Sequence, residues 1–331
     1  MSTSWPVFTG KLKPRNALTN LPPAPPWRPF APGEQPKGPS PLGGRDAVAR
    51  DQKLGETFVT SPAMVDAVNA ALFLRRPLLL TGRPGVGKSS LIRAVARELR
   101  MGVVLDWSIT SRSTLKEGIY DYDALGRLYA KNTGAGNISI GNFVTLGPLG
   151  IAMMASEWPR ALLIDEIDKS DLDLPNDLLN IFEKGDYTIP ELSRADERKV
   201  TVKCVQNLPP MEIEEGRIQC RQFPFVVLTS NGEREFPGPF LRRCVRLEVE
   251  EPKLAQLECI VTSHFNEAQR QSAQDLIEEF DKLRAKGQLA SDQLLNAVFL
   301  HLSGAPIEED PEAPLAEGER TLKSRIFDPL D

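Results

Sequence analysis

The chain has 331 residues, a length that suits about two folded domains. Its 40 Lys and Arg residues against 45 Asp and Glu residues give a formal net charge of −5, which argues against a protein that coats nucleic acid through bulk charge. Four cysteines without a CxxC pair make a structural zinc site unexpected. No apolar run approaches the roughly 18 residues of a membrane helix, and the N-terminus lacks a signal-peptide pattern, so we expect a cytoplasmic protein without membrane insertion.

Residues 1–56 are interpreted as a proline-rich, disordered N-terminal arm. Nine of the twenty residues from Pro22 to Pro41 are proline, and such a segment favours extended backbone that buries little surface. This composition is typical of a linker, either disordered or strapped onto the folded part. The alternative is a partner-binding arm in which Trp27 and Phe30 are the anchors.

Beyond residue 56, short apolar runs alternate with helical patterns. The expected strands are 78–80, 103–107, 161–164, 225–229 and 245–249, and the expected helices are 61–74, 88–100, 148–157 and 175–184. Residues 112–147 are expected to be irregular, and charged turns predict hairpins over 186–222. Continuous apolar strands between helices predict an α/β domain over 57–250, with a parallel sheet covered by helices on both faces.

After Pro252 the pattern becomes purely helical. Helical segments at 253–265, 271–286 and 291–302 predict a small all-helical domain over 251–303. The remaining residues, 304–331, are acidic and rich in proline, and we expect a disordered tail there.

A glycine-rich loop follows the first expected strand. Residues 82–89 read GRPGVGKS and fit the pattern G-x-x-x-x-G-K-[ST], in which backbone N–H groups and the start of the next helix bind phosphate. A chance glycine turn is the alternative, but a buried strand before the loop and an amphipathic helix after it favour a phosphate site. The expected ATP-binding residues are Gly82, Pro84, Gly85, Val86, Gly87, Lys88, Ser89 and Ser90, with Mg²⁺ on the Ser89 hydroxyl.

Two carboxylates end the third buried strand. Asp165 and Glu166 directly follow residues 161–164, at the edge of a parallel sheet where ligands bind. Asp165 is expected to hold Mg²⁺ through water, and Glu166 to orient and polarise the water that attacks the γ-phosphate. The alternative is that these acids simply open a helix, whose dipole favours them.

Polar residues also lie at the ends of the last two expected strands: one follows strand 225–229, and two precede strand 245–249. The amide of Asn231, after strand 225–229, could bind the γ-phosphate or the attacking water, although an Asn before Gly232 also commonly starts a turn. Arg242 and Arg243 precede the last strand. Such an arginine could insert into a neighbouring subunit's site as an arginine finger, or it could cap the end of a helix.

The order of these motifs resembles that of the AAA+ ATPases. GRPGVGKSS, LLIDEID, VVLTSN and FLRRC are similar to Walker A, Walker B, sensor 1 and the arginine finger. The segments SPAMVDAVNAALFLRRPLLLTGRPGVGKSSL, FVTLGPLGIAMM and LLNIFEKGDYTIPEL look like the MoxR-type branch of that family. The resemblance covers about residues 57–250 and, more loosely, the helical end.

This resemblance implies a P-loop NTPase fold with an AAA+ core, a helical lid and a homo-oligomeric ring, usually a hexamer, with active sites between subunits. The matching residues are Lys88 and Ser89 for Walker A, Asp165 and Glu166 for Walker B, Asn231 for sensor 1, and Arg243, or the adjacent Arg242, for the finger. Residues 112–142 would be the helix-2 insert that faces the ring pore, and 186–222 would hold the hairpin before sensor 1. One departure is that Leu289–Gln293 carries no arginine where relatives often have a lid arginine, which points to slow turnover or reliance on a partner.

Three functions remain open at this point. The first is a remodelling ATPase that acts on a protein client with a von Willebrand factor A-type partner, in a bacterial multi-component regulatory or conflict system. The second is a nucleic-acid motor or loader, which is disfavoured because acidic side chains offset the basic ones of the insert: Arg112, Lys116, Arg127 and Lys131 against Glu117, Asp121 and Asp123. The third is a nucleotide-dependent switch or scaffold, which the missing lid arginine favours and Glu166 opposes.

Overall fold

The computed structural model describes residues 5–28, 42–133, 138–284 and 289–305, together with 322, 326 and 327. The chain divides into two compact units. The first comprises Met1–Glu56, Thr60–Thr81 and Ser89–Glu248, and the second comprises Thr57–Val59, Gly82–Lys88 and Val249–Asp331. No helix of the described ranges is long and apolar enough to cross a membrane.

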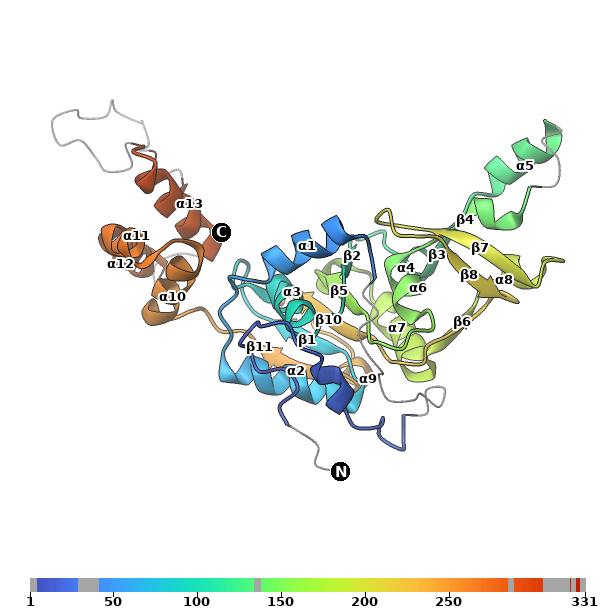
Figure 1. Ribbon diagram of the computed structural model, residues 1–331, viewed down its shortest axis with the longest axis horizontal. Helices are drawn as coiled ribbons and strands as arrows, with labels where there is room; N and C mark the ends of the chain where they lie inside the picture. The colour runs from blue at the N-terminus through green and yellow to red at the C-terminus, as the bar shows by residue number, and fades with distance from the viewer. Residues whose placement is uncertain are drawn as a thin grey trace. The chain divides into compact units, whose positions relative to one another are not determined.

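A five-stranded sheet forms the centre of the first unit (Figure 1). Its order is β11-β1-β10-β5-β2, and each pair of neighbours is parallel. The strands are β1 (Leu78–Thr81), β2 (Val104–Ser108), β5 (Ala161–Asp165), β10 (Phe225–Ser230) and β11 (Val245–Glu248). Every residue of the central strand β10 is buried, which is why its sequence reads as a continuous apolar run. The parallel sheet confirms the predicted α/β class.

Helices flank this sheet (Figure 1). They are α2 (Pro62–Leu74), α3 (Lys88–Glu98), α6 (Pro148–Met153), α7 (Asp173–Lys184) and the short α9 (Gly238–Leu241). Helix α2 begins as predicted, because the Ser61 hydroxyl accepts a hydrogen bond from the Met64 N–H at 3.3 Å and proline takes the first helical position.

A second, six-stranded sheet in the order β3-β4-β7-β8-β9-β6 belongs to the same unit. Its strands are β3 (Tyr120–Tyr122), β4 (Val144–Leu146), β6 (Asp186–Thr188), β7 (Lys199–Cys204), β8 (Met211–Glu214) and β9 (Arg217–Gln219). The antiparallel pairs of consecutive strands, β7–β8 and β8–β9, confirm the hairpins predicted between 186 and 222, and β6 pairs with β9. Helix α8 (Pro190–Ser193) lies within that stretch.

The expectation of an irregular stretch over 112–147 is wrong for most of its described residues. It contains α4 (Leu115–Ile119), α5 (Ala124–Asn132) and the 3-10 helix η2 (Ile140–Phe143), and β3 pairs with β4 as an antiparallel hairpin. A capping box at Thr114 and Glu117 starts α4, and the Asp123 carboxylate caps α5. These short helices lack a buried apolar periodicity long enough to be recognised: α5 buries none of its residues.

The part of the second unit after residue 249 is helical in its described residues. It contains α10 (Leu254–His264), α11 (Glu267–Ser272), α12 (Gln274–Arg284) and α13 (Ser291–Leu302). Leu257, Ile277, Phe280 and Leu294 are among the fully buried side chains of its own core. Most of the expected tail over 304–331 lies outside the described residues, but Phe327 packs in this core, 5.4 Å from the Phe280 ring centroid.

The described part of the N-terminal segment is not the disordered arm that its composition predicts. Val7, Phe8, Leu18 and Leu21 are buried, and the segment forms the 3-10 helix η1 (Ala17–Asn20) and helix α1 (Arg45–Leu54). Apolar side chains spaced among the prolines therefore do bury surface, which a proline count alone does not reveal. Residues 29–41, which include Phe30, lie outside the described ranges.

Two buried polar side chains hold this segment against the rest of the first unit. The Asn69 amide oxygen accepts hydrogen bonds from the N–H groups of Val7 and Phe8 at 2.7 and 2.9 Å, and its amide nitrogen donates to the Phe8 carbonyl at 2.8 Å. The buried Glu98 carboxylate accepts from the N–H and the hydroxyl of Thr9, both at 2.7 Å. Because backbone groups inside a protein must be paired, these contacts fix the path of the segment.

We expect Asn69→Leu to lower the free energy of unfolding by about 3 kcal/mol, because a side chain of similar size would leave three buried backbone groups unpaired. Urea denaturation would measure the change, with Asn180→Ala on the exposed face of α7 as the matched control. An Asn69→Leu protein as stable as the control would show that the segment is not held as described.

Candidate functional site

The loop Gly82–Lys88, between β1 and α3, has the backbone that a phosphate-binding loop needs. Gly82, Gly85 and Gly87 all have positive φ angles, of 146°, 74° and 88°. A side chain at Gly85 would also place a Cβ 2.1 Å from the Ala290 Cβ, so space and conformation both require glycine there. Lys88 Nζ donates to the carbonyls of Gly82 and Arg83 at 2.7 and 2.8 Å, which places the ammonium within the loop.

Within the second unit, the start of α13 lies against this loop. The Ser291 N–H donates to the Gly85 carbonyl at 3.4 Å, and Ala290 contacts Gly85 as described above. This is the stretch that lacks the lid arginine which relatives often have. The two residues that meet the loop here, Ala290 and Ser291, are uncharged.

In the first unit, a hydroxyl–carboxylate network joins the ends of β5 and β10 to the start of α3. Ser89 Oγ donates to Asp165 Oδ1 at 2.7 Å, and Thr229 Oγ1 donates to the same oxygen. Thr229 Oγ1 also accepts from the Glu166 N–H at 2.9 Å. The register Leu228↔Ile164 places Thr229 beside Asp165, so sheet pairing itself builds this network.

Glu166 is held in an unusual backbone conformation just beyond β5. Its φ and ψ of 59° and 48° are left-handed, a region that costs a non-glycine residue about 1–2 kcal/mol. The hydrogen bond to Thr229 stabilises this turn, after which the 3-10 helix η3 (Ile167–Lys169) follows. Backbone strain of this kind, held by its surroundings, is typical of functional positions.

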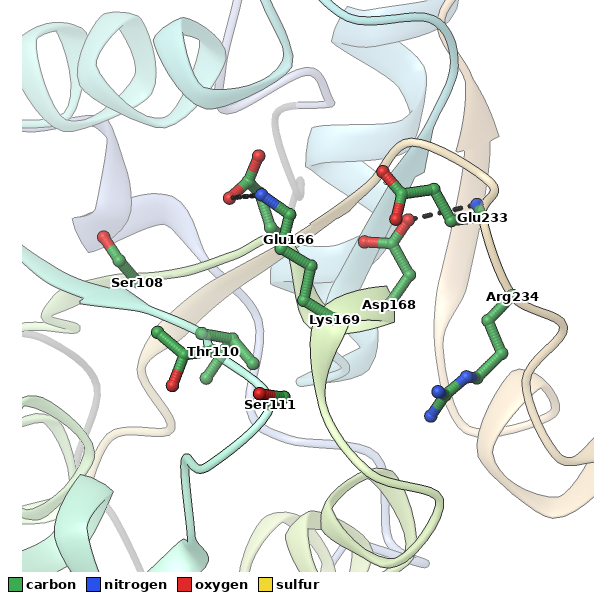
Figure 2. Close-up of a pocket in the computed structure, with 9 residues that line it drawn as sticks. Ser108, Thr110, Ser111, Glu166, Asp168, Lys169, Glu233 and Arg234 are labelled. Atoms are coloured by element: carbon green, nitrogen blue, oxygen red, sulfur yellow. Dashed lines mark hydrogen bonds and ion pairs between the residues drawn. The ribbon is translucent and has the colours of Figure 1, made fainter.

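An open pocket of about 550 Å³ lies beside Glu166 (Figure 2). It is lined by residues that end or follow three strands of the parallel sheet: Ser108, Ile109, Thr110, Ser111, Glu166, Asp168, Lys169, Glu233 and Arg234. Lys169 Nζ lies 2.7 Å from Glu166 Oε2, and this hydrogen bond raises the pKa of Lys169. Because the two side chains are 42% and 40% exposed, the ion pair is worth at most about 1 kcal/mol and exchanges readily with solvent.

Asp168 fixes the loop that carries Asn231. Its buried carboxylate accepts, through Oδ2, from the N–H groups of Asn231 at 2.8 Å and Glu233 at 3.2 Å, the second of which Figure 2 shows. The Asn231 backbone is thus set one residue beyond β10, next to the strand that ends at Asp165. The structure therefore brings Ser89, Asp165, Glu166 and Asn231 to the carboxyl edge of the sheet.

The two arginines lie elsewhere. Arg242 ends α9, and Arg243 forms an ion pair with Glu183 at the end of α7 while also donating to the Pro239 carbonyl at 3.2 Å. Val245, two residues later, pairs with Leu78 at the start of β1. Arg243 therefore lies at the amino edge of the parallel sheet, opposite the edge that carries Asp165. Its hydrogen bond to the Pro239 carbonyl also caps the end of α9, which is the alternative role that the sequence offered for this arginine.

Comparison with known proteins establishes the family. The model of the ATPase family associated with various cellular activities (AAA) matches residues 78–251, a little over half of the chain. The chain therefore belongs to the AAA ATPases, a family whose members bind and hydrolyse ATP. This confirms the resemblance at the level of the family and does not reach the MoxR-type branch.

A relative is known from Rhodococcus erythropolis, where it is named an ATP-dependent protease ATP-binding subunit-like protein. It is 30% identical over 197 residues, which cover 56% of this chain and 51% of the relative. The chain thus spans about half the length of that relative.

Three residues of this site were not singled out from the sequence: Thr229, Asp168 and Lys169. Asp168 and Lys169 follow Asp165-Glu166 within the next three positions, so their closeness was visible, although their partners were not. Thr229 was read only as the end of a strand. Its polar side chain at the end of a fully buried strand was the available signal, because such a group needs a partner.

We expect Thr229→Val to lower ATP turnover about tenfold, because the Glu166 N–H and Asp165 would both lose a buried hydrogen-bond partner worth about 1–3 kcal/mol. Thr229→Ser keeps the hydroxyl and is the matched control, expected to retain most activity. Steady-state ATPase assays of the two variants would measure the effect. If Thr229→Val were as active as the wild-type protein, the Thr229 hydroxyl would have no role in ATP turnover.

Proposed function

We propose that this chain is a Mg²⁺-dependent, MoxR-like AAA+ ATPase that works as a homo-oligomeric ring and remodels a protein client. The observation that carries the proposal is the separation of its candidate catalytic groups. Ser89, Asp165 and Thr229 lie at the carboxyl edge of the parallel sheet, whereas Arg243 lies at the amino edge.

This separation follows from strand direction. Strands β1, β5, β10 and β11 all run the same way, and a strand residue advances about 3.3 Å. Arg243 precedes β11, so the length of that strand keeps it away from the edge that carries Asp165. An arginine that serves the reaction from that position would act on the nucleotide of a second copy of the chain, as an arginine finger does.

The loop suits the phosphates of a nucleotide, and the network suits Mg²⁺. The loop Gly82–Lys88 offers backbone N–H groups, the start of α3 and the Lys88 ammonium to the phosphates. Ser89 Oγ and Asp165 Oδ1 lie 2.7 Å apart and provide a hydroxyl and a carboxylate. Mg²⁺ usually takes one or two protein oxygens and completes its shell with water and phosphate, so this donor pair fits it. When bound, the ion would neutralise phosphate charge.

Hydrolysis requires a water held in line with the γ-phosphate. The Glu166 carboxylate is the candidate to orient and polarise that water, and the Asn231 amide is the candidate to bind the water or the γ-phosphate. In the structure Glu166 accepts from Lys169, but that exposed ion pair is weak enough to open when a ligand binds. Asp168 supports both groups, since it is part of the same turn as Glu166 and binds the Asn231 N–H.

A protein client is favoured over nucleic acid by the insert. Helix α5, at the outer end of the second sheet (Figure 1), exposes Leu125, Leu128 and Tyr129 by 69%, 55% and 69%. These positions share one helical face, and an exposed apolar face suits protein contact better than contact with a polyanion. The name of the Rhodococcus erythropolis relative, an ATP-binding subunit-like protein of a protease, also favours a protein client. Because the sequence resembles the MoxR-type branch, the proposal includes a von Willebrand factor A-type partner.

We expect Glu166→Gln to bind ATP with nearly unchanged affinity and to lose at least about 10²-fold in turnover, because the amide cannot polarise the attacking water. Binding of a fluorescent ATP analogue and steady-state ATPase assays measure the two effects. Glu157→Gln, at an exposed position outside the site, is the control. Full turnover in Glu166→Gln would contradict the assignment.

We expect Arg243→Ala to lose at least about 10²-fold in turnover with little change in ATP affinity, since the arginine serves the transition state of a neighbouring site. The adjacent Arg242→Ala provides a matched control and is expected to retain most activity. Mixing an excess of Arg243→Ala protein into wild-type protein should lower activity per wild-type subunit. If Arg242→Ala were the inactive variant instead, the finger would be Arg242.

A further inference from the structure

The N-terminal segment sends one side chain to the edge that carries Arg243. Arg28 Nη2 donates to the Arg75 carbonyl at 2.6 Å, at the end of α2, and to the Phe182 carbonyl at 3.0 Å, in the last turn of α7. Its guanidinium lies 5.4 Å from the Phe223 ring centroid. Arg75 Nη2 in turn donates to the Pro22 carbonyl at 2.6 Å, so the segment 22–28 is fastened near both of its ends.

The contact with Phe182 fixes the end of α7. The last carbonyls of a helix have no hydrogen-bond donor within the helix. Here the Gly185 N–H donates to the Ile181 carbonyl at 2.8 Å, and Arg28 donates to the Phe182 carbonyl. Glu183 is the next residue, and its carboxylate forms the ion pair with Arg243. These contacts form a path from Arg28 through the end of α7 and Glu183 to Arg243.

A second path reaches the same arginine through the backbone. Arg76, next to Arg75, donates through Nη1 to the Arg242 carbonyl at 2.6 Å, directly before Arg243. Burial lowers the pKa of Arg28, and the nearby charges of Arg76 and Arg243 lower it further, while Glu183 raises it. Of these three guanidinium groups, Arg243 forms the ion pair with Glu183, whereas Arg28 and Arg76 bind backbone carbonyls.

We propose that Arg28 is a positioning residue for Arg243, and that the N-terminal segment is therefore a part of the shared ATPase site. Arg28 does not touch the nucleotide. It holds the end of α7 so that Glu183 keeps the Arg243 guanidinium at the amino edge, ready to meet the phosphates of a neighbouring subunit. This inference rests on the proposed function, because it requires Arg243 to act between subunits.

The test is a double-mutant cycle on the full chain. We expect Arg28→Ala to lower kcat about tenfold with the KM for ATP unchanged, because ATP binds to groups that Arg28 does not contact. In an Arg243→Ala background, Arg28→Ala should cause no further loss, since its effect passes through Arg243. Lys13→Ala removes an exposed charge from the same segment and is the control.

Arg28→Lys provides a second variant in case Arg28→Ala does not fold. It keeps the charge but lacks the planar guanidinium, which binds both carbonyls through Nη2 and lies 5.4 Å from the Phe223 ring centroid, so an intermediate kcat is expected. The same fractional loss of kcat in both backgrounds, or no loss in the wild-type background, would overturn the proposal. If Arg243→Ala alone kept full turnover, the proposed shared site would be wrong, and Arg28 would have no catalytic arginine to position. This result differs from the two above, so failure of the proposed function can be told from failure of the Arg28 proposal.

Discussion

The common direction of the strands in the five-stranded sheet is the constraint on which the account depends. Because β1, β5, β10 and β11 are parallel, the sheet has two chemically different edges. One edge gathers Ser89, Asp165, Glu166 and Thr229 through the strand register, and the other carries Arg243. Under the proposed function, a single chain presents the parts of a phosphoryl-transfer site on opposite edges, and a ring of copies would bring them together.

The groups at the carboxyl edge differ in how firmly they are held. Asp165 and Asp168 are fixed by several hydrogen bonds at buried or half-buried positions, whereas the Glu166–Lys169 ion pair is exposed and weak. Glu166 can therefore change partner while its backbone stays in place. At the other edge, Arg243 pairs with Glu183, which follows the Phe182 carbonyl that Arg28 binds. Under our proposal, the segment that composition suggested was a spacer would therefore contribute to the ATPase site.

The sequence predicted the strands, the glycine loop and the two carboxylates because each of these is a local pattern. Thr229 was missed because its importance comes from lying beside Asp165 across two strands, which depends on register rather than on composition. The N-terminal segment was misread for a related reason. The side chains that bind its backbone, Asn69 and Glu98, lie more than sixty positions further along the chain. The proline content of the segment does not predict these contacts. Helices α4 and α5 are too short for their periodicity to be detected.

The most direct test of a site shared between subunits is complementation between two inactive variants. Lys88→Ala protein keeps its Arg243 but lacks the loop lysine, whereas Arg243→Ala protein keeps an intact loop. In a ring, some interfaces of a mixture pair an intact loop with an intact Arg243, so the account predicts that mixing the two inactive proteins restores measurable ATPase activity. A mixture that stays as inactive as its components, although it assembles, would contradict the shared site.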